Sequence, residues 1–329
     1  MNRQFNVEFL QDVLTYVTKF ILVRSKGTEF TSKGPAPYIG DILSDPELLW
    51  TEDSALDEER IQEAQLRIEK QGAAISQFWK DKYVNKAGTF WHQFYQRNST
   101  HFYKDRHYLH IVFPELAPES TRNSPLRLLE VGCGVGNAVL PLLELNQYLL
   151  VHAIDFATSA IDILKTNEYC SKLVLDIDNR KSAKKIPRLN ASVCDIVKDE
   201  LPQEVVAGSM DFVLCMFVLS AISPLHQQDV ISKLLSCLKP GGKLLMRDYG
   251  RYDEAQLRFG KGSKLADNFY VRQDGTCAYY YDVDELKRMV ESAGGECEEC
   301  YYILRQYANR GQKMARRRVW VHAKFIKTN

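Results

Sequence analysis

Short apolar runs alternate with segments of helical spacing from about residue 123 to the end of the chain. Five such runs predict buried strands, near residues 126, 149, 188, 210 and 241. Apolar positions with helical spacing predict the helices between them, near residues 138, 158 and 227. A helix at 282–292 and two strands, at 297–307 and 319–327, complete the pattern. Because strands that alternate with helices build parallel sheets, this order predicts a doubly wound, seven-stranded α/β sheet that closes with an antiparallel hairpin.

The first part of the chain lacks this alternation and predicts a separate helical lobe. We expect a helix at residues 6–23, a Gly/Pro/Ser/Thr-rich connection at 25–40 and a second helix at 57–82. The first helix has an amphipathic pattern, but Glu8 and Asp12 argue against a mitochondrial presequence. We therefore expect two domains, at residues 1–122 and 123–329.

A glycine-rich turn follows the first predicted strand, 126–131. Gly132, Gly134 and Gly136 allow a tight turn and let a ligand approach main-chain N–H groups. Their spacing is G-x-G-x-G and differs from the G-x-G-x-x-G of dinucleotide sites. Glu130 precedes the first glycine and would repel a pyrophosphate, whereas it can accept hydrogen bonds from the ammonium of S-adenosyl-L-methionine. The turn therefore predicts a methyl-donor site.

The next strands end in residues that suit the nucleoside part of this donor. Asp155 lies about 20 residues past the glycine turn, where a carboxylate at a strand end accepts hydrogen bonds from ribose hydroxyls. Asp195 repeats the arrangement one strand later and suits the adenine amino group, with Ile196 against the ring and Met216 at the fourth strand's end. Each acid taken alone also fits a solvated turn. Acids at consecutive strand ends favour a binding site.

Charge and cysteine content limit the remaining classes of function. The net charge is +1, so any nucleic-acid surface must be a local patch. Eight cysteines are scattered along the chain, several inside apolar runs, which predicts reduced thiols and an intracellular compartment. Cys297 and Cys300 have a metal-like spacing, but a second pair is missing and a strand would turn them to opposite faces. We expect no metal.

Two further observations concern surfaces. No apolar stretch approaches the ~20 residues of a membrane span, so we expect no membrane association. The segment 171–188 is highly charged and precedes the third strand of the sheet. It predicts a solvated excursion from the domain.

Two segments bear on the methyl acceptor, and the first mixes aromatic with basic side chains over residues 90–109. Its members include Trp91, Phe94 and Tyr95 at helical spacing, and then Lys104, Arg106 and His107. RNA bases and phosphates are recognised by such a mixture. The alternative is a helix with an aromatic packing stripe, followed by an ordinary polar face.

The second segment extends over residues 247–276, after the turn Pro240-Gly241-Gly242 and the expected fifth strand, 243–246. It follows the carboxyl end of that strand, so we expect it to overhang the methyl donor. Its Arg, Asp, Tyr and Gln side chains suit the surroundings of a base that is flipped out of its stack.

Several strings occur along the chain in a specific order. They are Phe94-Tyr95, Phe102-x-Lys104-Asp105-Arg106-His107, Glu130-x-Gly132-Cys133-Gly134-x-Gly136-Asn137, Phe217-Val218-Leu219-Ser220-Ala221, Arg247-Asp248-Tyr249-Gly250, Arg258-Phe259 and Asn268 to Thr276. In this order they resemble the eukaryotic tRNA 3-methylcytidine methyltransferases, and the resemblance extends from about residue 78 to the end of the chain.

The resemblance implies a class I, Rossmann-like methyltransferase domain that methylates the cytosine at nucleotide 32 of the tRNA anticodon loop. It implies that Trp91 and Tyr95 in the N-terminal lobe close over the donor, beside Gly132, Asp155, Asp195, Ile196 and Met216. The string Arg97-Asn98-Ser99-Thr100 is similar to the branch that modifies serine tRNAs, often with seryl-tRNA synthetase. Two departures are Tyr108, where the family usually has Trp, and the length of the 171–188 insertion.

The chemistry of such a transfer can be argued from the acceptor. Ring nitrogen 3 of neutral cytosine already carries a lone pair, so the attack needs alignment and a place for positive charge, and no general base. Asp248 suits that charge and Tyr249 or Phe269 suits stacking, so Arg247, Asp248 and Tyr249 are the expected catalytic residues. The expected RNA contacts are Lys104, Arg106, His107, Arg258, Arg272 and Arg316, the last within the run Arg316-Arg317-Arg318. That run equally fits a solvated edge with one buried partner.

Two other functions remain as alternatives. A methyltransferase that acts on a protein or a small molecule would have a closed pocket without a basic rim. A donor-binding subunit that only scaffolds another protein would have a damaged glycine cradle, and here the cradle is complete. For the preferred function we expect a monomer that binds the tRNA anticodon arm, located in the cytoplasm and also in the nucleus.

Overall fold

The computed structural model describes residues 56–328, apart from 99–102, 121–124, 168–169, 171–172, 180–181 and 310–313. Side chains are not described at 175–179, 182–185, 306–309 and 314–316. The helix expected at 6–23 and the connection at 25–40 lie outside the described residues.

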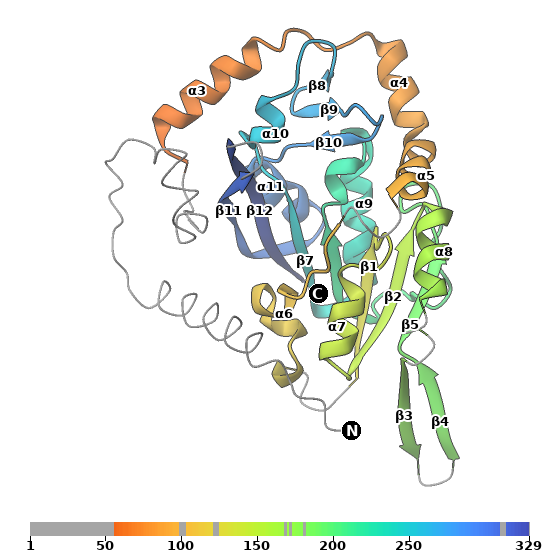
Figure 1. Cartoon of the computed structure of the whole chain (residues 1–329). Coiled ribbons are helices and arrows are strands. Elements are labelled where there is room, and N and C mark those ends of the chain that lie inside the picture. The colour runs from red at the N-terminus through yellow and green to blue at the C-terminus, as the bar shows by residue number, and fades with distance from the viewer. Residues whose placement is uncertain are drawn as a thin grey trace.

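A seven-stranded sheet forms the centre of the molecule, as predicted (Figure 1). Its strands, in spatial order, are β11 (Gly295–Asn309), β12 (Met314–Lys327), β7 (Leu238–Tyr249), β6 (Met210–Met216), β1 (Leu126–Val131), β2 (Leu149–Asp155) and β5 (Leu189–Val193). The strands from β7 to β5 pair in parallel, whereas β12 is antiparallel to both β7 and β11. The doubly wound sheet with its closing hairpin is therefore confirmed.

The fifth predicted strand is longer than expected. β7 continues through Tyr249, because Asp248 and Tyr249 pair with Val321 and Trp320 of β12. The prediction that this strand ends at Met246 is wrong. Arg247, Asp248 and Tyr249 thus lie within a strand and not in the connection that follows it.

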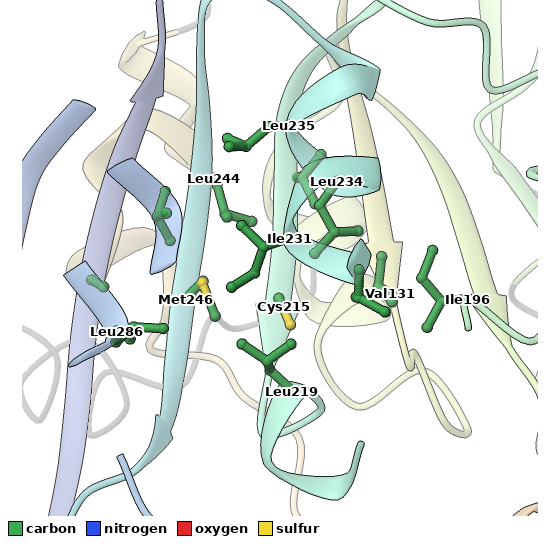
Figure 2. Packing of buried hydrophobic residues seen from close by; sticks show 14 of the residues in the cluster. Val131, Ile196, Cys215, Leu219, Ile231, Leu234, Leu235, Leu244, Met246 and Leu286 are labelled. Atoms are coloured by element: carbon green, nitrogen blue, oxygen red, sulfur yellow. The ribbon is translucent and has the colours of Figure 1, made fainter. Parts of the chain in front are cut away.

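Helices cover both faces of the sheet. One face carries α6 (Leu109–Val112), α7 (Val139–Leu145) and α8 (Thr158–Thr166), and the other carries α9 (Pro224–Cys237) and α11 (Val283–Ser292). Figure 2 shows Ile231 of α9 against Leu244 and Met246 of β7. The expected helix at 282–292 is confirmed, and its first turn is capped by the Asp282 carboxylate, which accepts from the N–H groups of Asp284 and Glu285.

The charged helix expected at 57–82 is wrong in its length. The structure has α3 (Glu58–Glu69) and α4 (Gln77–Asn85), followed by α5 (Ala87–Asn98). The helical conformation is interrupted after α3, where Gly72 adopts a φ of 81°. Tertiary contacts hold the break, because the Gln71 amide donates to the carbonyl of Gln256 at 2.8 Å and Ile75 N–H donates to Lys264 O at 2.8 Å.

The long connection after β7 folds into a small sheet of its own. Helix α10 (Glu254–Leu257) precedes β8 (Lys264–Ala266), β9 (Phe269–Val271) and β10 (Cys277–Tyr279). In Figure 1 this sheet lies between α3 and α4. Helix α5 packs on its β9–β10 turn, because a Cβ at Gly275 would lie 2.4 Å from the Phe90 ring. The N-terminal helices and this connection thus form one cap on the domain.

The charged insertion forms a two-stranded antiparallel hairpin, β3 (Val174–Asn179) with β4 (Ser182–Pro187). Figure 1 shows the hairpin projecting from the body, on the side away from α3, α4 and α5. A projecting hairpin agrees with the prediction that this segment leaves the domain.

Candidate active site

The glycine turn between β1 and α7 has the backbone that its sequence predicts. Gly132 and Gly134 have φ values of 63° and 56°, a region that residues with a Cβ rarely adopt. A Cβ at Gly132 would lie 2.4 Å from Val218, and one at Gly134 would lie 2.6 Å from the Tyr95 hydroxyl oxygen. The turn is therefore a cradle in which neighbouring side chains lie directly against the main chain.

Asp155 lies at the end of β2, beside this cradle. Its Oδ2 accepts from Gly134 N–H at 2.9 Å, and its Oδ1 accepts from Ala157 N–H at 2.8 Å. Burial raises the pKa of the carboxyl to about 6, against the opposing effect of these two N–H groups. Each carboxylate oxygen has a second lone pair, so Asp155 can hold the cradle and still accept from ribose hydroxyls. That ligand role stays a prediction.

Glu130 is a buried acid near the end of β1, just before the glycine turn. Its side chain is only 3% exposed, and within the described chain its Oε2 is a buried atom without a hydrogen-bond partner. Burial raises its pKa to about 8, while the charge of Arg106 opposes the rise. A buried acceptor of this kind needs a donor, preferably a cationic one. The ammonium of S-adenosyl-L-methionine fits this requirement.

Replacing Glu130 with glutamine is expected to separate donor binding from stability. We expect the variant to lose at least tenfold in donor affinity, because a charge-assisted hydrogen bond disappears. The pKa of Glu130 is higher in the folded than in the unfolded state. The stability that the buried carboxyl allows in its neutral form is therefore complete below about pH 4.5 and is lost as the pH rises through 8. Without donor, the variant should therefore melt higher than the parent at pH 9 and not at pH 5. Equal donor affinity by calorimetry would contradict this role of Glu130.

Helix α5 covers the cradle. Tyr95 is buried with its hydroxyl above Gly134, and Trp91 lies with its ring centroid 6.0 Å from that of Tyr95. Phe94 and Tyr95 pack with Val135 of the turn and with the start of α8. The aromatic stripe of α5 is thus a packing stripe and also the roof of the cradle. That Trp91 and Tyr95 contact the donor stays a prediction.

The third strand-end acid lies in a turn after β5. Asp195 is partly exposed, and its carboxylate accepts from Val197 N–H at 3.0 Å and pairs with Lys198 at 3.1 Å. Ile196 follows it in the chain and is buried in the core cluster that contains Val131 and Ile154, whereas Met216 ends β6 and is buried in the cluster on the other face of the sheet. These positions agree with an adenine site, which stays a prediction.

Asp248 of β7 is more enclosed than the sequence suggests. It is 1% exposed, with Oδ2 accepting from Ser220 N–H and Oδ1 from Tyr249 N–H, both at 2.9 Å. Burial raises its pKa to about 6, and the hydrogen bonds from Ser220 oppose the rise. The carboxylate thereby fixes the 3₁₀ turn η5 (Leu219–Ala221) to β7. Its expected role toward a base stays a prediction.

Arg247 and Tyr249 point to the other face of β7, since side chains alternate along a strand. The Arg247 Nε donates to His322 Nδ1 at 3.4 Å, and its guanidinium lies 5.8 Å from the Tyr108 ring. The Tyr249 ring lies 5.1 Å from that of Phe217, at the end of β6. Strand alternation thus separates Asp248 from its two sequence neighbours.

An aromatic and basic cluster surrounds Phe217, and we call it the acceptor cluster. It comprises Phe217, Tyr249, Arg106 and Arg272: the Arg106 guanidinium lies 5.0 Å from the Phe217 ring, and that of Arg272 lies 5.3 Å from the Tyr249 ring. Arg272 also donates to Thr276 Oγ1 at 3.3 Å. Since β6 lies between β1 and β7, the cluster is next to the donor cradle.

The other expected RNA contacts are more scattered. Lys104, His107 and Arg258 are exposed. Arg316 lies in β12, opposite Tyr307 of β11, and its side chain is outside the described part of the structure. Arg318 forms an ion pair with the buried Asp253 at 2.8 Å, so the Arg run does include one partner-bound member.

Asn137 ties the basic string to the donor cradle. Its carbonyl accepts from Arg106 N–H at 2.7 Å, and its amide donates to Asp105 Oδ1 at 2.9 Å and to Tyr103 O at 3.2 Å. Asn137 follows Gly136 directly. The string from Tyr103 to His107 is therefore part of the wall of the cradle as well as a basic surface.

Charge reversal at Lys104 and at Arg106 is expected to have different effects. Lys104→Glu should weaken tRNA binding and reduce the log–log salt slope by about 0.7 to 0.9, with donor affinity unchanged, because Lys104 is exposed. Arg106→Glu should weaken both ligands, because Arg106 acts on Glu130. Fluorescence titrations over a salt series test both. A Lys104→Glu protein with the parent's tRNA affinity and slope would make the string a folding element only.

Sequence reasoning missed the backbone of Phe217 and the surroundings of Arg247. Phe217 has a φ of 62° and donates its N–H to Arg247 O at 2.8 Å, a conformation that costs free energy in a residue with a Cβ. His322 lies against Arg247, and its Nε2 lies 3.2 Å from Glu299 Oε2. The string Phe217-Val218-Leu219-Ser220-Ala221 had marked Phe217, whereas nothing in the sequence marked His322.

The residues that the structure describes include no group of three or more His, Cys, Asp or Glu side chains that suits a metal ion. Cys300 lies with its Sγ 3.7 Å from Val283 O, in β11. Among the described helices, none is both long and apolar enough to cross a membrane.

Comparison with known families identifies a methyltransferase domain. A family model described as a methyltransferase domain matches residues 95–299. Together with the order of the sheet and the glycine cradle after β1, this match defines a class I S-adenosyl-L-methionine-dependent methyltransferase. A solved S-adenosylmethionine-dependent methyltransferase from Methanosarcina mazei is similar over 64% of this chain and 96% of its own, with 17% identity and a TM-score of 0.46.

Sequence relatives define the family more closely. The tRNA N(3)-cytidine methyltransferase METTL2 of Xenopus tropicalis is 36% identical over 288 residues, which cover 75% of this chain and 80% of the relative. The tRNA N(3)-cytidine methyltransferase METTL6 of Homo sapiens is 37% identical over 266 residues, covering 80% and 89%. The chain belongs to the tRNA N(3)-cytidine methyltransferase family, which confirms the resemblance noted in the sequence.

Proposed function

We propose that this protein transfers the methyl group of S-adenosyl-L-methionine to ring nitrogen 3 of the cytosine at nucleotide 32 of the tRNA anticodon loop. The observation that carries the proposal is the acceptor cluster beside the donor cradle, in a chain of this family. Aromatic rings and guanidinium groups are the partners that an unstacked base and its phosphates require.

The donor-side residues divide the work of binding. Glu130 accepts from the ammonium, Asp155 from the ribose hydroxyls, and Asp195 from the adenine amino group, with Ile196 against the ring. Trp91 and Tyr95 cover the ligand from α5 and exclude water. S-adenosyl-L-methionine supplies an electrophilic methyl group on a sulfonium. Gly132 and Gly134 supply the left-handed backbone of the turn beside which its methionine part lies.

The acceptor-side residues align the base and receive its charge. The lone pair on nitrogen 3 forms the new bond to carbon, the sulfonium leaves as a thioether, and positive charge passes to the base. Tyr249 stacks on the ring, and Asp248 stabilises the cation through its negative potential. Arg272 and Arg106 hold neighbouring phosphates, whereas Arg247 is buried against His322. Position at the carboxyl ends of β6 and β7, next to the cradle, supports these roles.

Serine tRNAs are the proposed substrates, with seryl-tRNA synthetase as an assisting partner. The string Arg97-Asn98-Ser99-Thr100 supports this choice through its resemblance to that branch. The experiment is incubation with purified tRNA transcripts, followed by mapping of 3-methylcytidine. We expect methylation of a serine transcript, faster with the synthetase present, and none when nucleotide 32 is uridine. Equal methylation of the uridine-32 transcript would refute the position, and preference for a non-serine transcript would refute the tRNA choice.

A further inference from the structure

Helix α4 leaves two adjacent aromatic side chains in solvent. Phe78 is 70% exposed and Trp79 is 43% exposed, whereas the aromatic residues of α5 are all buried or half-buried. Their rings lie edge to face with centroids 5.5 Å apart. Adjacent exposed aromatic rings form an apolar patch, and such patches mark interaction sites.

These rings begin a row that leads to the acceptor cluster. Trp79 stacks with Tyr83 at 6.3 Å between centroids, and Tyr83 lies 5.9 Å from Phe90. Phe90 packs on the Gly275 turn, which follows Arg272 of the acceptor cluster. The row therefore extends from solvent to the place where the base is proposed to bind.

The helix that carries the row is fixed to the acceptor segment. Ile75 N–H donates to Lys264 O of β8, just before α4 begins. Tyr83 and Val84 of α4 pack against the core cluster that contains Leu265 and Phe269 of the small sheet. Figure 1 shows α4 beside that sheet. Phe78 and Trp79 thus have a set position relative to the acceptor cluster.

Positive charge accompanies the exposed rings. The Lys82 ammonium lies 4.3 Å from the centroid of the Trp79 ring, and Lys80 and Lys86 flank it along the chain. Asp81 is the one acidic residue from Gln77 to Lys86. A base can stack on the rings while its phosphates meet the lysines, whereas an apolar protein partner would have to desolvate these charges.

We propose that Phe78 and Trp79 form a stacking platform for an unpaired nucleotide of the substrate RNA, with Lys82 at an adjoining phosphate. The inference rests on the proposed function, since it concerns the RNA whose cytosine enters the acceptor cluster. It assigns the platform to nucleotides of the loop next to the methylated base, and α4 to substrate affinity rather than to chemistry.

The test compares Trp79→Ala and Phe78→Ala with Trp79→Phe, which keeps a ring, and with Leu225→Ala, an exposed apolar residue of α9. The probes are a fluorescent anticodon-arm hairpin and the same stem closed as an uninterrupted duplex. We expect each alanine variant to lose about tenfold in affinity for the hairpin, since stacking contributes roughly 1–3 kcal/mol per base. Trp79→Phe should restore most of it. Duplex affinity, donor affinity and melting temperature should stay at parental values, as should all properties of Leu225→Ala.

Other occupants of α4 give other results. Unchanged hairpin affinity in Trp79→Ala would overturn the proposal. A parent protein that is a dimer, with Trp79→Ala a monomer, would overturn it as well. If residues 1–55 covered α4, they would shield Trp79 from acrylamide in the absence of RNA. Quenching would then not differ between the parent and Trp79→Phe. Methylation of tRNA by the parent is measured alongside. Its absence would refute the proposed function, whereas normal methylation with unchanged affinity in the variants would refute only this inference.

Discussion

Asp155→Ala is expected to lower the affinity for S-adenosyl-L-methionine by about a hundredfold or more. The variant loses two charge-assisted hydrogen bonds to the ribose, which together contribute on the order of 3 kcal/mol. It also loses the carboxylate that holds Gly134 N–H and Ala157 N–H, so the cradle itself relaxes. Both effects act on the same ligand. Isothermal titration calorimetry with the donor measures the loss directly.

Asp211, at the amino end of the strands, offers a matched control. Its carboxylate also accepts from a backbone N–H, that of Arg127 at 2.8 Å, and pairs with Lys239 at 2.6 Å. Asp211→Ala should keep parental donor affinity, because the residue lies at the amino end of β6, away from the glycine turn. If Asp155→Ala bound the donor as the parent does, the assignment of the end of β2 to the ribose would be withdrawn.

Asp248→Asn is expected to lower turnover by about a hundredfold while donor affinity is roughly preserved. The variant loses the negative potential that stabilises the methylated, cationic base. The asparagine amide would also face Ser220 N–H or Tyr249 N–H with a donor, which costs about 1–3 kcal/mol of stability. Single-turnover assays on saturating tRNA, well below the melting temperature, separate the two effects.

The pH dependence of the parent gives a second view of Asp248. Its pKa is raised to about 6 by burial, so the carboxylate is charged above that pH and turnover should fall as the pH drops through 6. Asp248→Asn should lack this acidic limb, whereas Asp211→Asn should retain it. Normal turnover of Asp248→Asn would leave Asp248 as a positioning residue for η5 and direct attention to Asp274.

Local signals in the sequence predicted the centre of the sheet and the donor cradle. The glycine turn, the strand-end acids and the Asp282 cap depend on residues within one or two elements. Parallel order then places Glu130 and Asp155 at the same edge, because β1 and β2 are neighbours. For this reason the sequence could place the glycine turn and these two acids at the same end of the sheet.

Contacts between distant residues account for what the sequence did not predict. The break between α3 and α4 depends on Gln71 bonding to Gln256, far away in the chain. β7 extends through Tyr249 because β12 pairs with it. The enclosure of Asp248 comes from Ser220, which no spacing in the sequence links to it. The members of the acceptor cluster likewise come from four separate segments of the chain. The sequence could therefore indicate their residue types but not their arrangement.

The most direct test of the central claim is nucleoside mass spectrometry after incubation of the protein with total tRNA, lysate protein and isotopically labelled S-adenosyl-L-methionine. Our account predicts label in 3-methylcytidine from the tRNA, at a rate that Asp155→Ala reduces by about a hundredfold at limiting donor. Label in another nucleoside, or in protein in place of tRNA, would contradict it.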